Sequence, residues 1–123
     1  MLRVYVAGKY SGSDVISILK NIKDGISFSA KVMKCGFSVY VPWLDHQLAF
    51  FEDFDVQTYK DVSMSWLEVS DAVILVPDQE RSQGVLDEIQ RAKELNIPVF
   101  ESLDDLIGWA RLVRTGADWN GLV

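Results

Sequence analysis

One segment in the second half of the chain constrains the fold most, because it joins a buried strand directly to a helix. Residues 72–77 form an apolar run that predicts a strand, and residues 78–81 form a polar loop. Ser82 and Gly84 then open a helical pattern that continues through residues 85–95. A helix that begins directly after a strand and a short loop offers free backbone N–H groups and a positive dipole end to an anion.

A carboxylate follows this predicted anion site closely. Glu88 would lie roughly 6 Å along the helix axis from Gly84, because an α-helix rises 1.5 Å per residue. A helix end that suits a phosphate, with a carboxylate about one sugar's width away, predicts chemistry on a nucleotide.

The rest of the chain continues the alternation of strands and helices. Short apolar runs predict further strands at residues 2–7, 37–41 and 97–100. Helical spacing and capping residues predict helices from Ser13 or Asp14 to Gly36, over 59–70, and over 103–113 after Ser102. Residues 43–56 follow no clear period, and we expect a loop or short helix over the ligand site.

This alternation predicts an α/β fold with a doubly wound, flavodoxin- or Rossmann-like three-layer sandwich and a four- to five-stranded parallel sheet. With 123 residues, one domain is expected over residues 1–113, followed by a tail at 114–123. Ligands of such sheets bind beyond the carboxyl ends of the strands. The loops 8–13, 42–54 and 77–84 should therefore converge on the site.

Composition excludes several classes of function. The net charge of −6 argues against binding to nucleic acid, which favours a basic face. No apolar run approaches the roughly 20 residues that span a membrane. Cys35 is the only cysteine, which fits a reducing cytoplasmic setting, and His46 is the only histidine, so we expect neither a metal site nor a cofactor.

Several motifs, taken in order, resemble the nucleoside 2-deoxyribosyltransferase superfamily. They are the opening YVAGKYSG at residues 5–12, SDAVIL at 70–75, SQGVLDE at 82–88 with Arg91-Ala92, and IPVF at 97–100. The superfamily includes base-exchanging transferases and 2'-deoxynucleoside 5'-phosphate N-hydrolases. The resemblance covers residues 2–101 and implies a site for a small nucleotide or nucleoside.

The resemblance also assigns roles to individual residues. Glu88 falls at the position of the nucleophilic carboxylate, and Tyr5 at that of a tyrosine that holds it. Ser82 falls where nucleotide hydrolases have a serine that faces a 5'-phosphate and nucleoside transferases have an acid. The family's base-facing aspartate is not matched: Ser63 has the closest spacing, and Asp61, two residues earlier, is the expected acid.

Two further departures concern neighbouring positions. Ser11, with Lys9 nearby, stands where the nucleotide hydrolases have an arginine, and Ile89 replaces the glycine that follows the glutamate. The expected substrate-binding residues lie in the loops after the first three strands: Gly8, Lys9, Tyr10, Ser11, Trp43, His46, Ser82 and Gly84. Trp43 or Tyr10 would stack on the base, whereas Trp66 and Trp109, at helical spacing, are expected in the core.

The expected reaction is cleavage of the N-glycosidic bond of a (deoxy)nucleoside 5'-monophosphate, by hydrolysis or by deoxyribosyl transfer. The alternative is a non-catalytic nucleotide-binding or nucleotide-sensing module on the same fold, because a fold alone does not choose a function. A flavodoxin-like FMN protein is a weaker alternative, since the loops lack a Ser/Thr-rich phosphate run. The resemblance further implies a homodimer or higher homo-oligomer, for which Trp119 is a candidate anchor.

Overall fold

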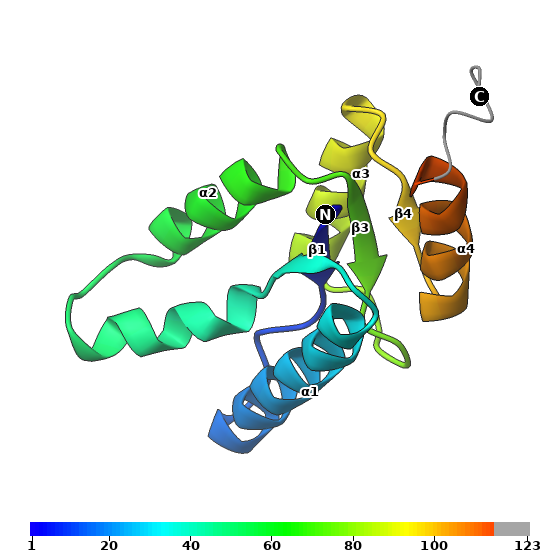
Figure 1. The fold of residues 1–123 in the computed structure, drawn as a ribbon. Coiled ribbons are helices and arrows are strands. Elements are labelled where there is room, and N and C mark those ends of the chain that lie inside the picture. Colours follow the sequence, from blue (N-terminus) through cyan, green and yellow to red (C-terminus); the bar gives the residue numbers. More distant parts are fainter. Residues whose placement is uncertain (115–123) are drawn as a thin grey trace.

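The computed structural model of the chain describes residues 1–114. Its elements follow one another along the chain as β1 (Arg3–Ala7), α1 (Val15–Lys34), β2 (Ser38–Tyr40), η1 (Pro42–Phe50), α2 (Val56–Leu67), β3 (Ala72–Leu75), α3 (Gln83–Glu94), β4 (Val99–Phe100) and α4 (Leu103–Arg114). The strands form a four-stranded sheet in the order β2-β1-β3-β4, and every pair in it is parallel. The predicted α/β class is confirmed (Figure 1).

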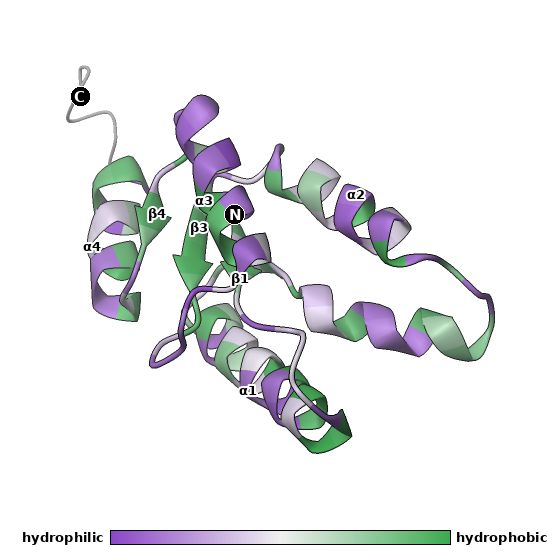
Figure 2. Ribbon diagram, turned by 180° about the vertical axis from the view of Figure 1, so that it is seen from behind, coloured by the Kyte–Doolittle hydropathy of each residue, from purple (hydrophilic) through white to green (hydrophobic). Residues whose placement is uncertain are grey.

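The sheet is buried on both faces, which makes three layers. Val4 and Val6 of β1 face one apolar cluster, which includes residues of α1 and α4. Tyr5 and Ala7 face the other cluster, which includes residues of α2 and α3. This alternation along one strand follows from the two-residue period of a β-strand. Helices on both faces of a parallel sheet confirm the doubly wound arrangement, and Figure 2 shows β3 as hydrophobic throughout.

The first helix contains a glycine that the packing explains. Asp14 caps α1 by accepting a hydrogen bond from the Ser17 backbone N–H (2.7 Å), as predicted. A Cβ at Gly25, in the middle of the helix, would lie 2.2 Å from the ring of Trp43. Gly25 therefore opens a slot in α1 that the indole fills.

Trp43 corrects a sequence-based expectation. Its side chain is only 1% exposed and its indole Nε1 donates to the Lys9 carbonyl (2.9 Å), so it is a core residue and does not offer a face to a ligand. Trp66, expected in the core, is 52% exposed. The two tryptophans thus have the reverse of their expected environments, because the slot at Gly25 accepts one of them.

The segment from Pro42 to Val69, which we call the arm, extends sideways from the sheet in Figure 1 as η1 followed by α2. The short helix over residues 42–50 was among the expected structures for this region. Helix α2 begins three residues earlier than predicted, because the Asp55 side chain accepts from the Thr58 N–H (2.8 Å) and caps it at Val56. Val62 and Val69 are 42% and 53% exposed, so this face of α2 is not part of the core.

The remaining elements match their predictions closely. Ser82 caps α3 and Ser102 caps α4, each through its side-chain oxygen. Strands β2 and β4 are shorter than the apolar runs that predicted them. Arg114 is the last residue of α4, and the rest of the expected tail, with Trp119, lies outside the described residues. Among the helices of residues 1–114, none has the length and apolarity that crossing a membrane requires.

The two helical glycines Gly25 and Gly108 provide a test of this packing. We expect Gly25→Ala to lower the free energy of unfolding by about 1–3 kcal/mol, because its Cβ would overlap the buried Trp43 ring. Gly108→Ala should raise it by up to about 1 kcal/mol, because Gly108 is exposed, has no atom within 4 Å of a new Cβ, and alanine favours a helix. Urea unfolding measures both, and a stabilised Gly25→Ala variant would contradict the slot.

Candidate functional site

The carboxyl ends of β1 and β3 form the edge where a ligand of this fold would bind. The chain leaves β1 toward α1 on one face of the sheet, and it leaves β3 toward α3 on the other face. The two loops therefore separate at the point where the strand order reverses, and a crevice forms there. Gly8 lines this crevice, and a Cβ on it would lie 2.7 Å from Val76 Cγ2, so only glycine allows the loops this close.

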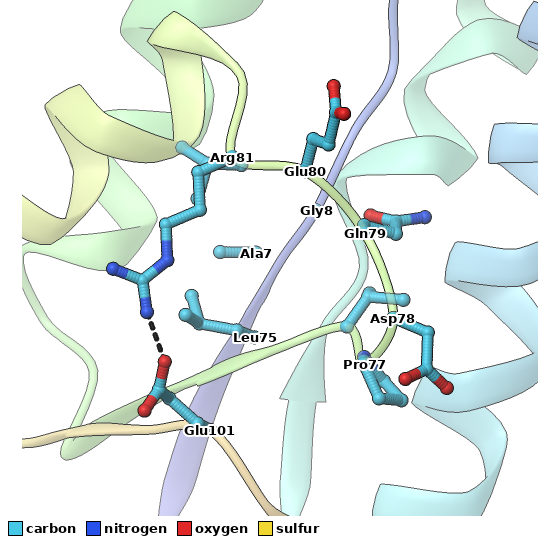
Figure 3. Close-up of a pocket in the computed structure, with 11 residues that line it drawn as sticks. Ala7, Gly8, Leu75, Pro77, Asp78, Gln79, Glu80, Arg81 and Glu101 are labelled. Carbon is cyan, nitrogen blue, oxygen red and sulfur yellow. Dashed lines mark hydrogen bonds and ion pairs between the residues drawn. The ribbon is translucent and has the colours of Figure 1, made fainter.

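Figure 3 shows a small cavity at this edge, between the loop after β3 and the start of α3. Its volume is about 120 Å³, well below the roughly 300–1,000 Å³ of pockets that enclose a whole ligand. Arg81 reaches across its rim to form an ion pair with Glu101, and the Gln79 Oε1 accepts a hydrogen bond from the Lys9 N–H (2.9 Å). The cavity therefore has room for one small polar group and has a cation at its rim.

The start of α3 borders this cavity. The Ser82 side chain accepts from the Val85 N–H (3.3 Å), and Val85 lines the cavity. Gly84 is exposed, and outside the adjacent residues and the helix backbone a Cβ built on it would meet only Ser82 Oγ, at 3.9 Å. Packing within the chain thus does not require a glycine at this position, and the backbone of the first helical turn stays open to approach.

Glu88 lies one turn further along α3 and contacts the central strand. The Tyr5 hydroxyl donates a hydrogen bond to Glu88 Oε2, and Tyr5 is completely buried. The structure therefore brings together the two residues that the sequence paired. Burial raises the pKa of Glu88 from 4.5 to about 7, although the hydrogen bond from Tyr5 acts in the opposite direction. Burial and the nearby Glu88 carboxylate together raise the pKa of Tyr5 strongly.

Two hydroxyl groups that the sequence reading did not assign to the site complete this cluster. Tyr40 is paired in register with Tyr5 across the sheet, and their rings are stacked with centroids 5.5 Å apart. Burial raises the pKa of both phenols, and hydrogen bonding with the Ser63 hydroxyl opposes this rise in both. Ser63 therefore lies at the junction of Tyr5 and Tyr40. The register of β2 against β1 is the signal that could have placed Tyr40 here.

Asp61 does not join this cluster. It lies two positions before Ser63, which corresponds to roughly 200° of rotation around an α-helix. Its carboxylate is exposed and accepts a hydrogen bond from Gln57 Nε2 (2.8 Å) on the outer side of α2. The expected acid thus points away from Glu88, because the helical turn that presents Ser63 to the strands presents Asp61 to solvent.

The predicted site residues of the loop after β1 lie in two different environments. Lys9 lines an open groove of about 540 Å³ beside α1, together with Lys20 and Lys31. Residues 76–80 separate that groove from the small cavity, because they line both. The backbone carbonyls of Tyr10 and Ser11 accept from Asn21 Nδ2 (3.3 and 3.0 Å), which ties this loop to α1.

The last predicted site residue, His46, lies in η1 next to Asp45. His46 Nδ1 donates to the Trp43 carbonyl (2.6 Å), which makes Nδ1 the protonated nitrogen of the ring and gives His46 a structural role in η1. Asp45 is half-buried, and its charge raises the pKa of both Tyr10 and Tyr40, although burial is the larger cause in each. Within residues 1–114, no three His, Cys, Asp or Glu side chains lie close enough to hold a metal ion.

Comparison with known proteins identifies the family of this chain. A model described as a domain of unknown function, DUF4406, matches residues 2–101. The chain belongs to this family. The matched DUF4406 region contains the whole sheet, Tyr5, Ser63, Ser82 and Glu88, and it ends before α4. A search of curated proteins finds no match.

The raised pKa of Glu88 predicts a pH-dependent stability. Between pH 4.5 and about 7 the folded chain keeps a proton that the unfolded chain has released, so the free energy of unfolding should fall as pH rises through this range. Glu88→Gln cannot titrate, and its stability relative to the wild type should rise by on the order of 3 kcal/mol between pH 4.5 and 8. Urea unfolding at several pH values measures this, with Glu52→Gln at an exposed position as the control. If the free energies of unfolding of the wild type and of Glu88→Gln changed in parallel with pH, this result would contradict the raised pKa of Glu88.

Proposed function

We propose that this protein cleaves the N-glycosidic bond of a (deoxy)nucleoside 5'-monophosphate, with Glu88 as the nucleophile. The observation that carries the proposal is the Glu88 carboxyl group, buried against the hydroxyl of Tyr5 and one turn from the open N-terminus of α3. This arrangement agrees with the resemblance to the nucleoside 2-deoxyribosyltransferase superfamily. A carboxylate with a raised pKa in such a place is typical of a functional site.

In the proposed reaction the ionised Glu88 attacks the anomeric carbon of the sugar while the base departs. Tyr5 orients the carboxylate through its hydrogen bond. Water or a second base then attacks the same carbon and releases Glu88, as in a retaining glycosidase. Because the pKa of Glu88 is about 7, the fraction of protein with an ionised nucleophile rises as pH increases through neutrality.

The 5'-phosphate would lie at the start of α3. The Ser82 hydroxyl and the first N–H groups of the helix can donate to phosphate oxygens, and the helix dipole favours the negative charge. The cavity beside them is large enough for a phosphate but not for a nucleotide, so we place the sugar beside Glu88 and the base toward Ser63 and Tyr40. Phosphate recognition distinguishes this proposal from one for free nucleosides.

Released base is the direct measurement. The purified protein is incubated with deoxynucleoside and ribonucleoside 5'-monophosphates and with the matching free nucleosides, and free base is followed by chromatography. We expect release from monophosphates and none from the Glu88→Ala variant. Nucleotide binding without release by the wild type would replace the proposal with a non-catalytic nucleotide-binding or nucleotide-sensing module.

Ser82→Asp tests the phosphate site without removing the helix cap, because aspartate caps helices as well as serine does. We expect KM for the monophosphate to rise about 10–100-fold, because a hydrogen bond to a charged group is replaced by repulsion. Ser82→Asn, which also caps and carries no charge, is the matched control. Equal KM values for the Asp and Asn variants would show that the phosphate does not contact this position.

We also propose that the chain self-associates through the arm, and that it acts in the cytoplasm, as its free Cys35 suggests. Apolar side chains of the arm are unusually exposed, with Phe50 at 79% and Phe51 at 84%. The segment 42–69 carries six carboxylates and one lysine. Helix α1 offers the complement: four lysines and one aspartate, with Ile16 and Leu19 exposed. The arm of one copy therefore suits α1 of another.

Light scattering on a size-exclusion column tests this association. We expect Phe50→Ser with Phe51→Ser to weaken it at least tenfold, because two exposed aromatic rings lose their buried area. Charge reversal in α1 by Lys20→Glu with Lys23→Glu should weaken it as well, and added salt should reduce the difference between this variant and the wild type. A wild-type chain that stays monomeric at high concentration would contradict the proposal.

A further inference from the structure

Three aromatic rings stack in a row that begins beside Glu88. Tyr5 of β1 and Tyr40 of β2 are paired in register, and their rings have centroids 5.5 Å apart and planes inclined by 13°. The ring of Trp66 in α2 continues the row, 5.8 Å from that of Tyr40 and inclined by 19°. Both separations lie within the roughly 4.5–7 Å that favourable aromatic pairs adopt. The row thus runs from the hydroxyl that donates to Glu88 to a half-exposed tryptophan.

Tyr40 has little support from its own strand. Strand β2 is the edge strand of the described sheet, and β1 is its neighbour there. Tyr40 is the last residue of β2, and the chain turns away into η1 at Pro42. Tyr5 covers the Tyr40 ring from the side of β1. The ring of Trp66 therefore gives the support that a further strand would give in the middle of a sheet.

Helix α2 holds Trp66 in a defined place relative to Glu88. Leu67, the next residue, is completely buried in the second hydrophobic cluster. Glu68 forms an ion pair with Arg91 of α3 (2.9 Å). Arg91 lies three residues after Glu88, so it is about one turn along the same helix. The helix that carries the outer ring is thus attached to the helix that carries the proposed nucleophile.

The row of rings also covers the hydrogen bond between Tyr5 and Glu88. Tyr5 is completely buried, and Tyr40, which is half-buried, lies between it and Trp66. If Tyr40 turned outward, Tyr5 would lose the ring that covers it at the edge of the sheet, and water could reach the carboxyl group. Burial is the largest cause of the raised pKa of Glu88, so this pKa reports how well the cover is maintained.

We propose that Trp66 is a positioning residue for the reaction: it holds Tyr40 against Tyr5 and so keeps the Tyr5 hydroxyl on Glu88. The inference rests on the proposed function. Two rings separate Trp66 from Glu88, so it acts through them and not by touching the sugar. A nucleophile that is misplaced by a fraction of its side-chain length attacks the anomeric carbon less often, which slows the reaction.

Trp66→Ala removes the outer ring and tests this role. We expect kcat for a deoxynucleoside 5'-monophosphate to fall about tenfold and KM to stay within about threefold, because alignment of the nucleophile matters most in the transition state. Trp66→Phe keeps a ring that can stack and should recover most of kcat. Val69→Ala shortens another half-exposed side chain at the end of the same arm, and it should leave kcat within about twofold.

The pH profile separates a positioning role from a general loss of structure. Water admitted by Trp66→Ala should lower the pKa of Glu88 from about 7 toward 4.5. The other titratable groups that act on Glu88 are Tyr5 of β1 and Asp87 of α3, and the variant retains both. Since more of the variant's nucleophile is then ionised in acid, the ratio of its kcat/KM to that of the wild type should be larger at about pH 5.5 than at about pH 8.

A double variant shows whether Trp66 acts through Tyr40. If it does, adding Trp66→Ala to Tyr40→Ala should cause no further loss of kcat. Losses that multiply would overturn this route. Equal losses for Trp66→Ala and Trp66→Phe would overturn the role of stacking, and an unchanged kcat and pH profile for Trp66→Ala would overturn the role of Trp66 altogether.

Urea unfolding gives a second readout that needs no activity. With Trp66→Ala present, the stability that Glu88→Gln gains over its parent between acid and neutral pH should be smaller than in the wild type, because the pKa of Glu88 is raised less. The same gain in both would overturn the role of Trp66. A wild-type protein that releases no base would overturn the proposed function, whatever the unfolding result, so the two failures are distinguishable.

Discussion

The packing of Trp43 against Gly25 determines how the rest of the functional edge is arranged. One indole ring fills a slot in α1, lies within contact of Gly8 in the first loop and donates to the carbonyl of Lys9. The backbone carbonyl of Trp43 also accepts from His46, which fixes the next turn of η1. A single buried side chain thus joins α1, the loop after β1 and the base of the arm, and the position of Asp45 depends on it.

The second core cluster contains a polar pair that stability alone does not explain. Tyr5 lies in this cluster between Val73 and Tyr40, yet its hydroxyl holds a carboxylate whose ionisation burial opposes. Two apolar residues in the same space would give a more stable core, because their burial has no desolvation cost. The presence of this polar pair on the central strand agrees with a chemical role for Glu88.

The order of elements could be predicted from the sequence because it depends on local signals. Apolar runs gave the strands, Ser82, Ser102 and Asp14 gave the helix starts, and the alternation gave the parallel sheet. The Tyr5–Glu88 contact was also expected, through the resemblance. The exchanged environments of Trp43 and Trp66 could not be predicted. The slot that accepts Trp43 is at Gly25, 18 positions earlier in the chain, and the hydrophobic periodicity of the sequence does not reveal such a contact.

For similar reasons, the sequence alone could not predict the whole candidate site. Asp61 and Ser63 are neighbours in the sequence but face opposite sides of α2, and the phase of the helix depends on the cap at Asp55. Tyr40 became part of the site through the register between β1 and β2. Ring stacking and strand register depend on tertiary structure. Strand β2 has three residues, which is too short for its sequence pattern to predict either one.

The ion pair between Arg81 and Glu101 would make the binding of an anion to Arg81 at the cavity a displacement reaction. Any anion that bonds to the Arg81 guanidinium must compete with a carboxylate that is already in place at the end of β4. Since an exposed ion pair of this kind contributes about 0–1 kcal/mol, a dianion can displace Glu101, whereas a monoanion gains little over the resident carboxylate. Glu101 would therefore act as a filter on ligand charge, and the freed carboxylate would loosen the connection between the loop after β3 and the edge strand β4.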